Sequence, residues 1–137
     1  MDEVYDLSGK LREWLLDQSS IVAYVDKRIF TPVIFGKNGE HGYEDETNPK
    51  IMFRQEGDAE GYRYFFLVED DEGREERCRE VATALYNSLV RRQLSLSAGS
   101  PERVVVRNAM PVGGMNDSRN ETNRYAQVFF SLNFLSV

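Results

Sequence analysis

The sequence predicts an α+β domain in which two helices pack on one face of a mainly antiparallel sheet of four to five strands. Two segments, near the N-terminus and at 74–93, repeat apolar residues at helical spacing. Other segments alternate apolar with polar residues or are rich in β-branched and aromatic side chains. With 137 residues, 41% of them hydrophobic, we expect a single domain over 1–137.

The N-terminal part is expected to be helical over 4–17, where apolar residues recur at i, i+4, i+7 and i+8. These residues are Leu7, Leu11, Trp14 and Leu15. A second short helical piece is expected at 21–25. An extended segment follows at 27–32 and ends at Pro32, which has no N–H to donate to a neighbouring strand.

Two neighbouring strands are expected at 50–55 and 62–69, joined as a hairpin. In the second strand, alternate residues place two apolar sets on opposite faces, so both faces should be partly covered. The first set is Tyr62, Tyr64, Phe66 and Val68, and the second is Phe65 and Leu67.

The strongest helix is expected at 74–93, after an acidic run at 69–72. Its apolar stripe consists of Cys78, Val81, Ala82, Leu85 and Leu89. We interpret the acidic run as negative charge at the N-terminus of the helix that also favours solubility. It is not expected to bind calcium, because its consecutive carboxylates lack the alternate spacing of a calcium loop. Cys78 is expected to be a small buried core residue and not a nucleophile.

The C-terminal half should contain a turn-rich connector at 95–101, a strand at 103–110 and a closing strand at 124–137. In the closing strand one face is wholly apolar: Ala126, Val128, Phe130, Leu132 and Phe134. Two long polar loops are expected, near 36–48 and 111–123. Loops of this length in compact domains are often functional.

Composition and motifs favour a non-enzymatic protein without cofactor or metal. The net charge of −6 disfavours a protein that grips DNA. One cysteine and one histidine, His41, are too few for a zinc site, and no phosphate-binding glycine motif leads from a strand into a helix. Without a basic leader or a long apolar run, we expect no membrane association and a cytoplasmic location.

Five segments resemble those of a known family. They are 11–16 (Leu-Arg-Glu-Trp-Leu-Leu), 25–30 (Val-Asp-Lys-Arg-Ile-Phe), 48–53 (Asn-Pro-Lys-Ile-Met-Phe), 80–86 (Glu-Val-Ala-Thr-Ala-Leu-Tyr) and 125–134 (Tyr-Ala-Gln-Val-Phe-Phe-Ser-Leu-Asn-Phe). In this order they resemble the tail terminator (tail completion) proteins of long-tailed bacteriophages, which are small acidic α+β proteins.

The resemblance implies a structural role at the head-proximal end of the virion tail, after assembly in the host cytoplasm. Such proteins form a ring, typically a hexamer, that caps the tail tube, stops its polymerisation and meets the head-connector protein. DNA passes through the ring without specific binding, and an acidic lumen would favour this because it repels phosphate.

A ring requires a heterologous interface whose rotation closes. The second face of the closing strand supplies the candidate interface residues Tyr125, Phe129 and Leu135. The two long loops supply candidate assembly residues, which are expected to order on contact with the tube: Asn38, His41, Tyr43, Met115, Asp117 and Arg119. The alternatives are a head-tail connector or neck protein, and a small enzyme or ligand-binding α+β domain that uses the His41 loop.

Overall fold

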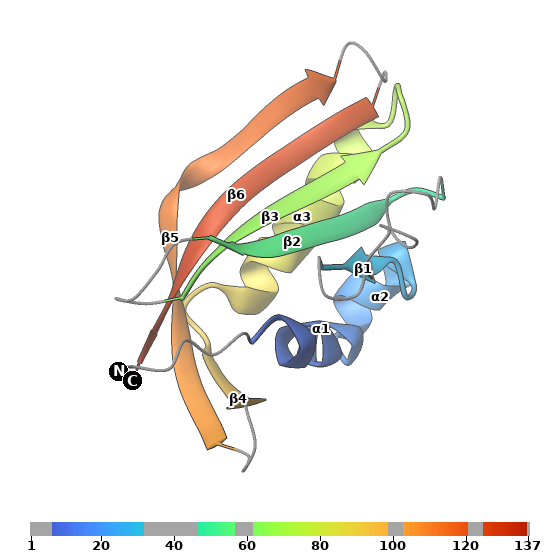
Figure 1. The fold of residues 1–137 in the computed structure, drawn as a ribbon. Coiled ribbons are helices and arrows are strands. Elements are labelled where there is room, and N and C mark those ends of the chain that lie inside the picture. The colour runs from blue at the N-terminus through green and yellow to red at the C-terminus, as the bar shows by residue number, and fades with distance from the viewer. Residues whose placement is uncertain (1–6, 32–46, 57–61, 99–102, 121–124, 137) are drawn as a thin grey trace.

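The described part of the chain folds into one six-stranded sheet with three helices, shown in Figure 1. The structure is a computed structural model that describes residues 7–31, 47–56, 62–98, 103–120 and 125–136. The elements are α1 (Ser8–Leu16), α2 (Ser19–Val25), β1 (Ile29–Phe30), β2 (Lys50–Glu56), β3 (Tyr62–Asp70), α3 (Glu75–Leu89), β4 (Gln93–Ala98), β5 (Arg103–Asn120) and β6 (Tyr125–Ser136). The α+β class is confirmed.

The sheet is larger than the four to five strands expected, and the short helical piece expected at 21–25 is a third helix, α2, in addition to α1 and α3. The strand order is β1-β2-β3-β6-β5-β4, with β1 parallel to β2 and every other neighbouring pair antiparallel. The predicted hairpin of β2 and β3 is confirmed, because Lys50 pairs with Glu69 and Glu56 with Arg63. None of the described helices is long and apolar enough to span a membrane.

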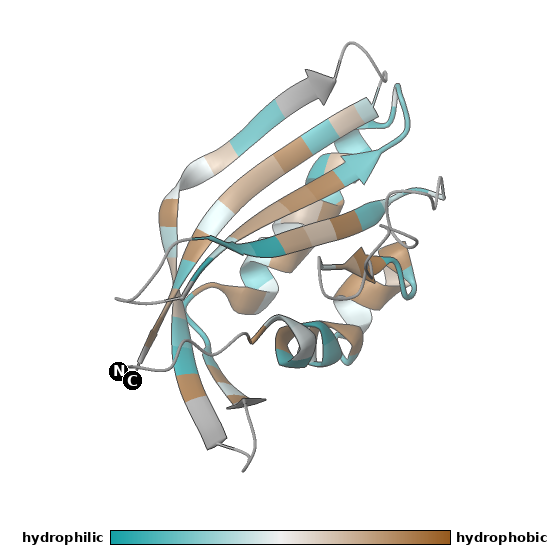
Figure 2. Ribbon diagram, in the orientation of Figure 1, coloured by the Kyte–Doolittle hydropathy of each residue, from teal (hydrophilic) through white to brown (hydrophobic). Residues whose placement is uncertain are grey.

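The core lies between the helices and one face of the sheet, and the alternation in β6 builds much of it. All five residues predicted for its apolar face are buried: Ala126, Val128, Phe130, Leu132 and Phe134. They belong to one cluster with Leu11 of α1, Ile21 of α2 and Leu85 of α3. Figure 2 shows hydrophobic residues concentrated along the middle of β2 and β3, with hydrophilic ones towards their ends, and hydrophobic residues along much of β6.

Aromatic rings cross the centre of this core from strand to strand. Phe66 of β3 stacks on Phe53 of β2 at 5.4 Å and on Phe130 of β6 at 5.2 Å, between ring centroids. Tyr86 of α3 meets Phe130 edge-on at 5.3 Å. The rings therefore connect β2, β3, β6 and α3 through direct contacts.

The segment after α3 differs from its prediction. The helix ends at Leu89 and not at residue 93, because Val90 is extended and Arg91 has a φ of 60°. The Arg91 N–H donates to the carbonyl of Ala109 at 2.7 Å, which turns the chain into β4 beside β5. The predicted connector at 95–101 is thus wrong for residues 95–98, which are strand, while 99–101 lie outside the described residues.

The predicted loop at 111–123 is also wrong as far as Asn120, because β5 continues through it. Between the pairs Val112–Ser131 and Asn116–Phe129, β5 advances four residues while β6 advances two. Gly113 lies in this bulge with a φ of 75°. Because an insertion of two residues preserves the alternation of the strand, the residues beyond it keep their faces. Residues 121–123 lie outside the described residues.

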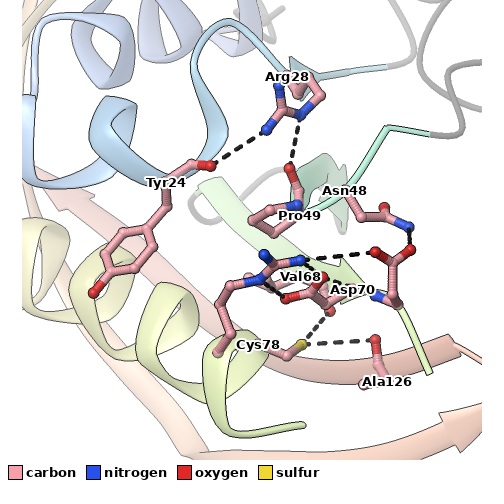
Figure 3. Close-up of polar contacts among 10 residues, drawn as sticks. Tyr24, Arg28, Asn48, Pro49, Val68, Asp70, Cys78 and Ala126 are labelled. Carbon is pink, nitrogen blue, oxygen red and sulfur yellow. Dashed lines mark hydrogen bonds and ion pairs between the residues drawn. The ribbon is translucent and has the colours of Figure 1, made fainter. Parts of the chain in front are cut away.

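The acidic run before α3 does more than supply surface charge. Asp70 is fully buried at the end of β3, where Arg77 of α3 donates to both its carboxylate oxygens, one of them at 2.7 Å. The Asp71 backbone N–H donates to Asp70 at 2.8 Å, and Asn48 donates to the Asp71 carboxylate at 2.9 Å (Figure 3). The hydrogen bond to Asp70 also raises the pKa of Arg77.

Replacing Asp70 with Ala should lower the free energy of unfolding by about 2 kcal/mol, because the Arg77 guanidinium and the Asp71 N–H both lose their acceptor. This loss of stability is smaller than expected for a fully buried ion pair, since Arg77 is partly exposed and can bind water. Urea denaturation measures it. The exposed Glu72→Ala control should change stability by less than about 0.5 kcal/mol. A loss no larger than the control's would show that this ion pair is not stabilising.

Candidate interaction surface

The face of the sheet opposite the helix-packed core, here called the outer face, carries the candidate interface. Strand pairing arranges its side chains in rows across β2, β3, β6 and β5. One row is Arg54, Phe65, Ser131 and Val112, and the next is Met52, Leu67, Phe129 and Asn116. The first row contains polar and charged side chains beside apolar ones, whereas the second is mostly apolar. This face therefore combines apolar and polar patches.

Tyr125, Phe129 and Leu135 all lie on the outer face, as their odd positions in β6 require, but they do not form one cluster. Tyr125 pairs with Asn120 at one end of β6, and Leu135 pairs with Asn108 near the other. Tyr125 and Leu135 are ten positions apart on β6, a distance of about 33 Å. Each candidate therefore belongs to a different patch.

Leu135 is the centre of the most exposed apolar patch. Val106 and Met110 lie two residues on either side of Asn108, the partner of Leu135, and so are its diagonal neighbours on β5. Leu135, Val106 and Met110 are 43%, 38% and 37% exposed. Apolar side chains grouped in this way on an open surface are typical of an interaction site.

Phe129 belongs to an aromatic patch at the middle of the sheet. Its ring lies 5.7 Å from that of Phe65, and the Arg54 guanidinium lies 5.3 Å from the Phe65 ring centroid. Leu67, next to Phe129 in the register, also contacts the buried pair Phe30 and Met52. Both phenylalanines are half-buried, so each still offers ring surface to a partner.

A polar ladder separates this patch from the Tyr125 end of the face. Lys50 pairs with Glu69 at 3.6 Å between Nζ and Oε2, and Gln127 donates to the Glu69 carboxylate at 3.0 Å. Lys50 is only 4% exposed. The ladder therefore satisfies its own charges and holds β2, β3 and β6 in register.

The predicted assembly residues of the second loop are part of β5. Met115 packs against the main core, and Asp117 forms an ion pair with Arg79 of α3 at 2.9 Å. Arg119 pairs through its backbone with Ala126. These residues attach β5 to the domain instead of forming a loop. Asn38, His41 and Tyr43, the candidates in the first loop, lie outside the described residues.

Cys78 is buried on α3, as predicted, and its thiol donates to the carbonyl of Val68 at 3.3 Å (Figure 3). Burial, together with the nearby Asp70 carboxylate, raises the pKa of this thiol to about 12. A neutral thiol is a poor nucleophile and a poor metal ligand. The described residues also contain no group of three or more His, Cys, Asp or Glu placed to hold a metal ion.

The raised pKa of Cys78 predicts slow thiol chemistry. At pH 8 the native protein should react with a thiol reagent at least about 100-fold more slowly than the urea-unfolded chain, because burial suppresses both access and thiolate. Since the native pKa exceeds the ordinary value of 9.0, the contribution of the Cys78 thiol to the free energy of unfolding should decline as the pH rises from about 9 towards 12. Similar native and unfolded reaction rates would contradict the buried placement.

The aromatic patch and the Leu135 patch combine residues from three strands that are distant in sequence. The alternation in 62–69 and 103–110 indicates that Phe65, Val106 and Met110 share a face with alternate residues of their own strands. Which strands are neighbours, and hence that these residues surround Phe129 and Leu135, has no sequence signal.

No protein-family model, curated protein or solved structure matches the chain.

Proposed function

We propose that this protein is a structural virion protein that caps the head-proximal end of a phage tail tube, stops its polymerisation and forms part of the head-tail joining interface. The sequence resemblance supports the assignment to a phage tail. The outer face supports the assignment to an assembly protein, and the exposed patch of Val106, Met110 and Leu135 is the observation that carries it. On this proposal the subunits form a ring, which is a hexamer by analogy with the family that the sequence resembles.

Two further features support an assembly role. Each described helix contributes to the core on the inner face, so none of these helices covers the outer face. The net charge of −6 also suits a channel through which DNA slides, because acidic walls repel phosphate. The partners on this proposal are further copies of the chain, the tail-tube protein and the head-connector protein.

Tube assembly tests the proposal. Purified protein added to the polymerising tail-tube protein of the same phage should bind tube ends and arrest growth, as seen in tube lengths by electron microscopy. A lysate without the protein should accumulate tubes of abnormal length that fail to join heads. Normal-length tails in that lysate, with no binding to tube ends, would refute the terminator role. Binding to the head connector alone would favour the connector alternative.

The enzyme alternative is tested separately through the single histidine. His41→Ala should leave tube capping unchanged on this proposal, because no step of assembly requires an imidazole. A folded His41→Ala protein that loses all biological activity would favour an enzyme or ligand-binding domain instead.

A further inference from the structure

We propose that the outer face of one subunit docks into a groove between α2 and α3 of a second copy of this chain. This inference rests on the proposed ring, for which it names the two contacting surfaces. It starts from the unequal charge of the two sides of the domain. The outer face carries exposed arginines beside an aromatic ring, whereas the groove carries exposed carboxylates beside apolar surface.

On the sheet side, Arg54 and Arg63 flank Phe65. Arg54 is opposite Phe65 in the register, and Arg63 precedes Phe65 by two residues on β3. The two arginines are therefore diagonal neighbours, with Cβ atoms about 7 Å apart. Among the described residues, Glu56 balances them through a partly exposed ion pair with Arg54 at 3.2 Å. Such a pair contributes little stability, so Arg54 can exchange it for another carboxylate.

On the helix side, an open groove of about 460 Å³ runs along α3 beside α2. Tyr24 of α2 and Thr83 and Ala84 of α3 line it, together with the carboxylates of Glu76 and Glu80. No ion pair among the described residues uses either carboxylate. The other charged residue of the groove, Arg79, already pairs with Asp117.

The two surfaces match in spacing as well as in charge. Glu76 and Glu80 are four residues apart on a helix, which places their Cβ atoms about 6 Å apart. The separation resembles that of Arg54 and Arg63, so each guanidinium meets one carboxylate. Phe65, which is adjacent to both arginines, then enters the groove between Tyr24 and Ala84. An aromatic anchor surrounded by charge pairs is a common arrangement at interaction hot spots.

This contact joins two different surfaces, so it is heterologous and leaves one free surface of each kind on every dimer. Repetition generates a ring if the rotation closes. A face-to-face contact between two outer faces would instead stop at a dimer and would bring the arginines of both copies together. Charge repulsion between like patches disfavours that arrangement.

Charge reversal on each surface tests the contact. One variant carries Arg54→Glu and Arg63→Glu, and the other carries Glu76→Arg and Glu80→Arg. Sedimentation velocity of the full chain, at low salt and up to several hundred micromolar, should show self-association weakened at least 100-fold in each variant alone. An equimolar mixture should associate again, because the reversed sheet face fits the reversed groove while the two unaltered surfaces still fit each other.

Circular dichroism of both variants ensures that lost association does not reflect unfolding, since all four positions are exposed. Arg91→Glu with Arg92→Glu, exposed but outside both surfaces, is the matched control and should associate like the parent. Parent protein that remains monomeric, a groove variant that associates normally, or a mixture that stays dissociated would each overturn the docking mode.

Tube capping separates this inference from the proposed function. If the mixture restores association but the parent does not arrest tube growth, the docking mode stands and the phage role fails. If the parent arrests growth but the variants associate normally, the phage role stands and the docking mode fails.

Discussion

Replacing Phe66 with Ala should lower the free energy of unfolding by about 4 kcal/mol, the largest effect expected of any change considered for this protein. Phe66 is fully buried and contacts two further rings, Phe53 and Phe130, on the strands at either side. The substitution removes both ring contacts and leaves a cavity in the middle of the sheet. Urea denaturation at low protein concentration measures the loss without a contribution from self-association.

Two controls locate the effect in the core. Phe66→Leu keeps much of the buried volume and should cost about 1.5 kcal/mol. Phe65→Ala, on the neighbouring residue but the outer face, should cost less than Phe66→Ala because Phe65 is only half-buried. Equal losses at positions 65 and 66 would show that both faces of β3 are packed alike, contrary to the structure.

Replacing Phe129 with Asp should weaken self-association at least 100-fold, equivalent to about 3 kcal/mol of binding free energy. On the proposed assembly the aspartate becomes an unpaired charge within or beside a desolvated contact. Sedimentation velocity measures the oligomer, and tube-end binding measures the functional consequence. The size of the effect depends on Phe129 lying against Phe65, so that either residue supports the other's contact.

Ala23→Asp, an exposed position on α2, is the matched control and should leave association unchanged. Leu135→Asp distinguishes the two apolar patches. This substitution should change the free energy of unfolding only slightly, because Leu135 is exposed. Loss of association at both Phe129 and Leu135 would extend the interface across both patches. Parent-like association of a folded Phe129→Asp protein would exclude the aromatic patch from the interface.

Much of the fold could be predicted from local pattern. The alternation of 124–137 identifies the buried face of β6, and the helical stripe of 74–93 places Cys78 in the core. The hairpin of β2 and β3 follows from two neighbouring strand segments. In each case a single repeating pattern separates buried from exposed positions, so neither the rest of the chain nor the strand order is needed.

Two segments could not be assigned in this way, since their structure depends on their partners. Residues 111–120 are rich in glycine, asparagine and charge, which disfavour a strand, but pairing with the strongly apolar β6 overrides that preference. Residues 93–98 become a strand because β5 lies beside them. In the sequence, Asp70 does not differ from the other three acidic residues of the run at 69–72. Its burial depends on Arg77, which contacts it from the next helix.

The sequence by itself determined which side is apolar in the elements with a clear repeat, such as α3 and β6, because that choice depends on the helical or strand repeat of the element alone. Only the tertiary structure decided which elements are neighbours. It placed Phe65 against Phe129, and Leu135 between Val106 and Met110, by setting β6 between β3 and β5. The physical reason is that strand order and register follow from the packing of the whole core. A surface patch is made from side chains of several strands, so its composition depends on that order and register.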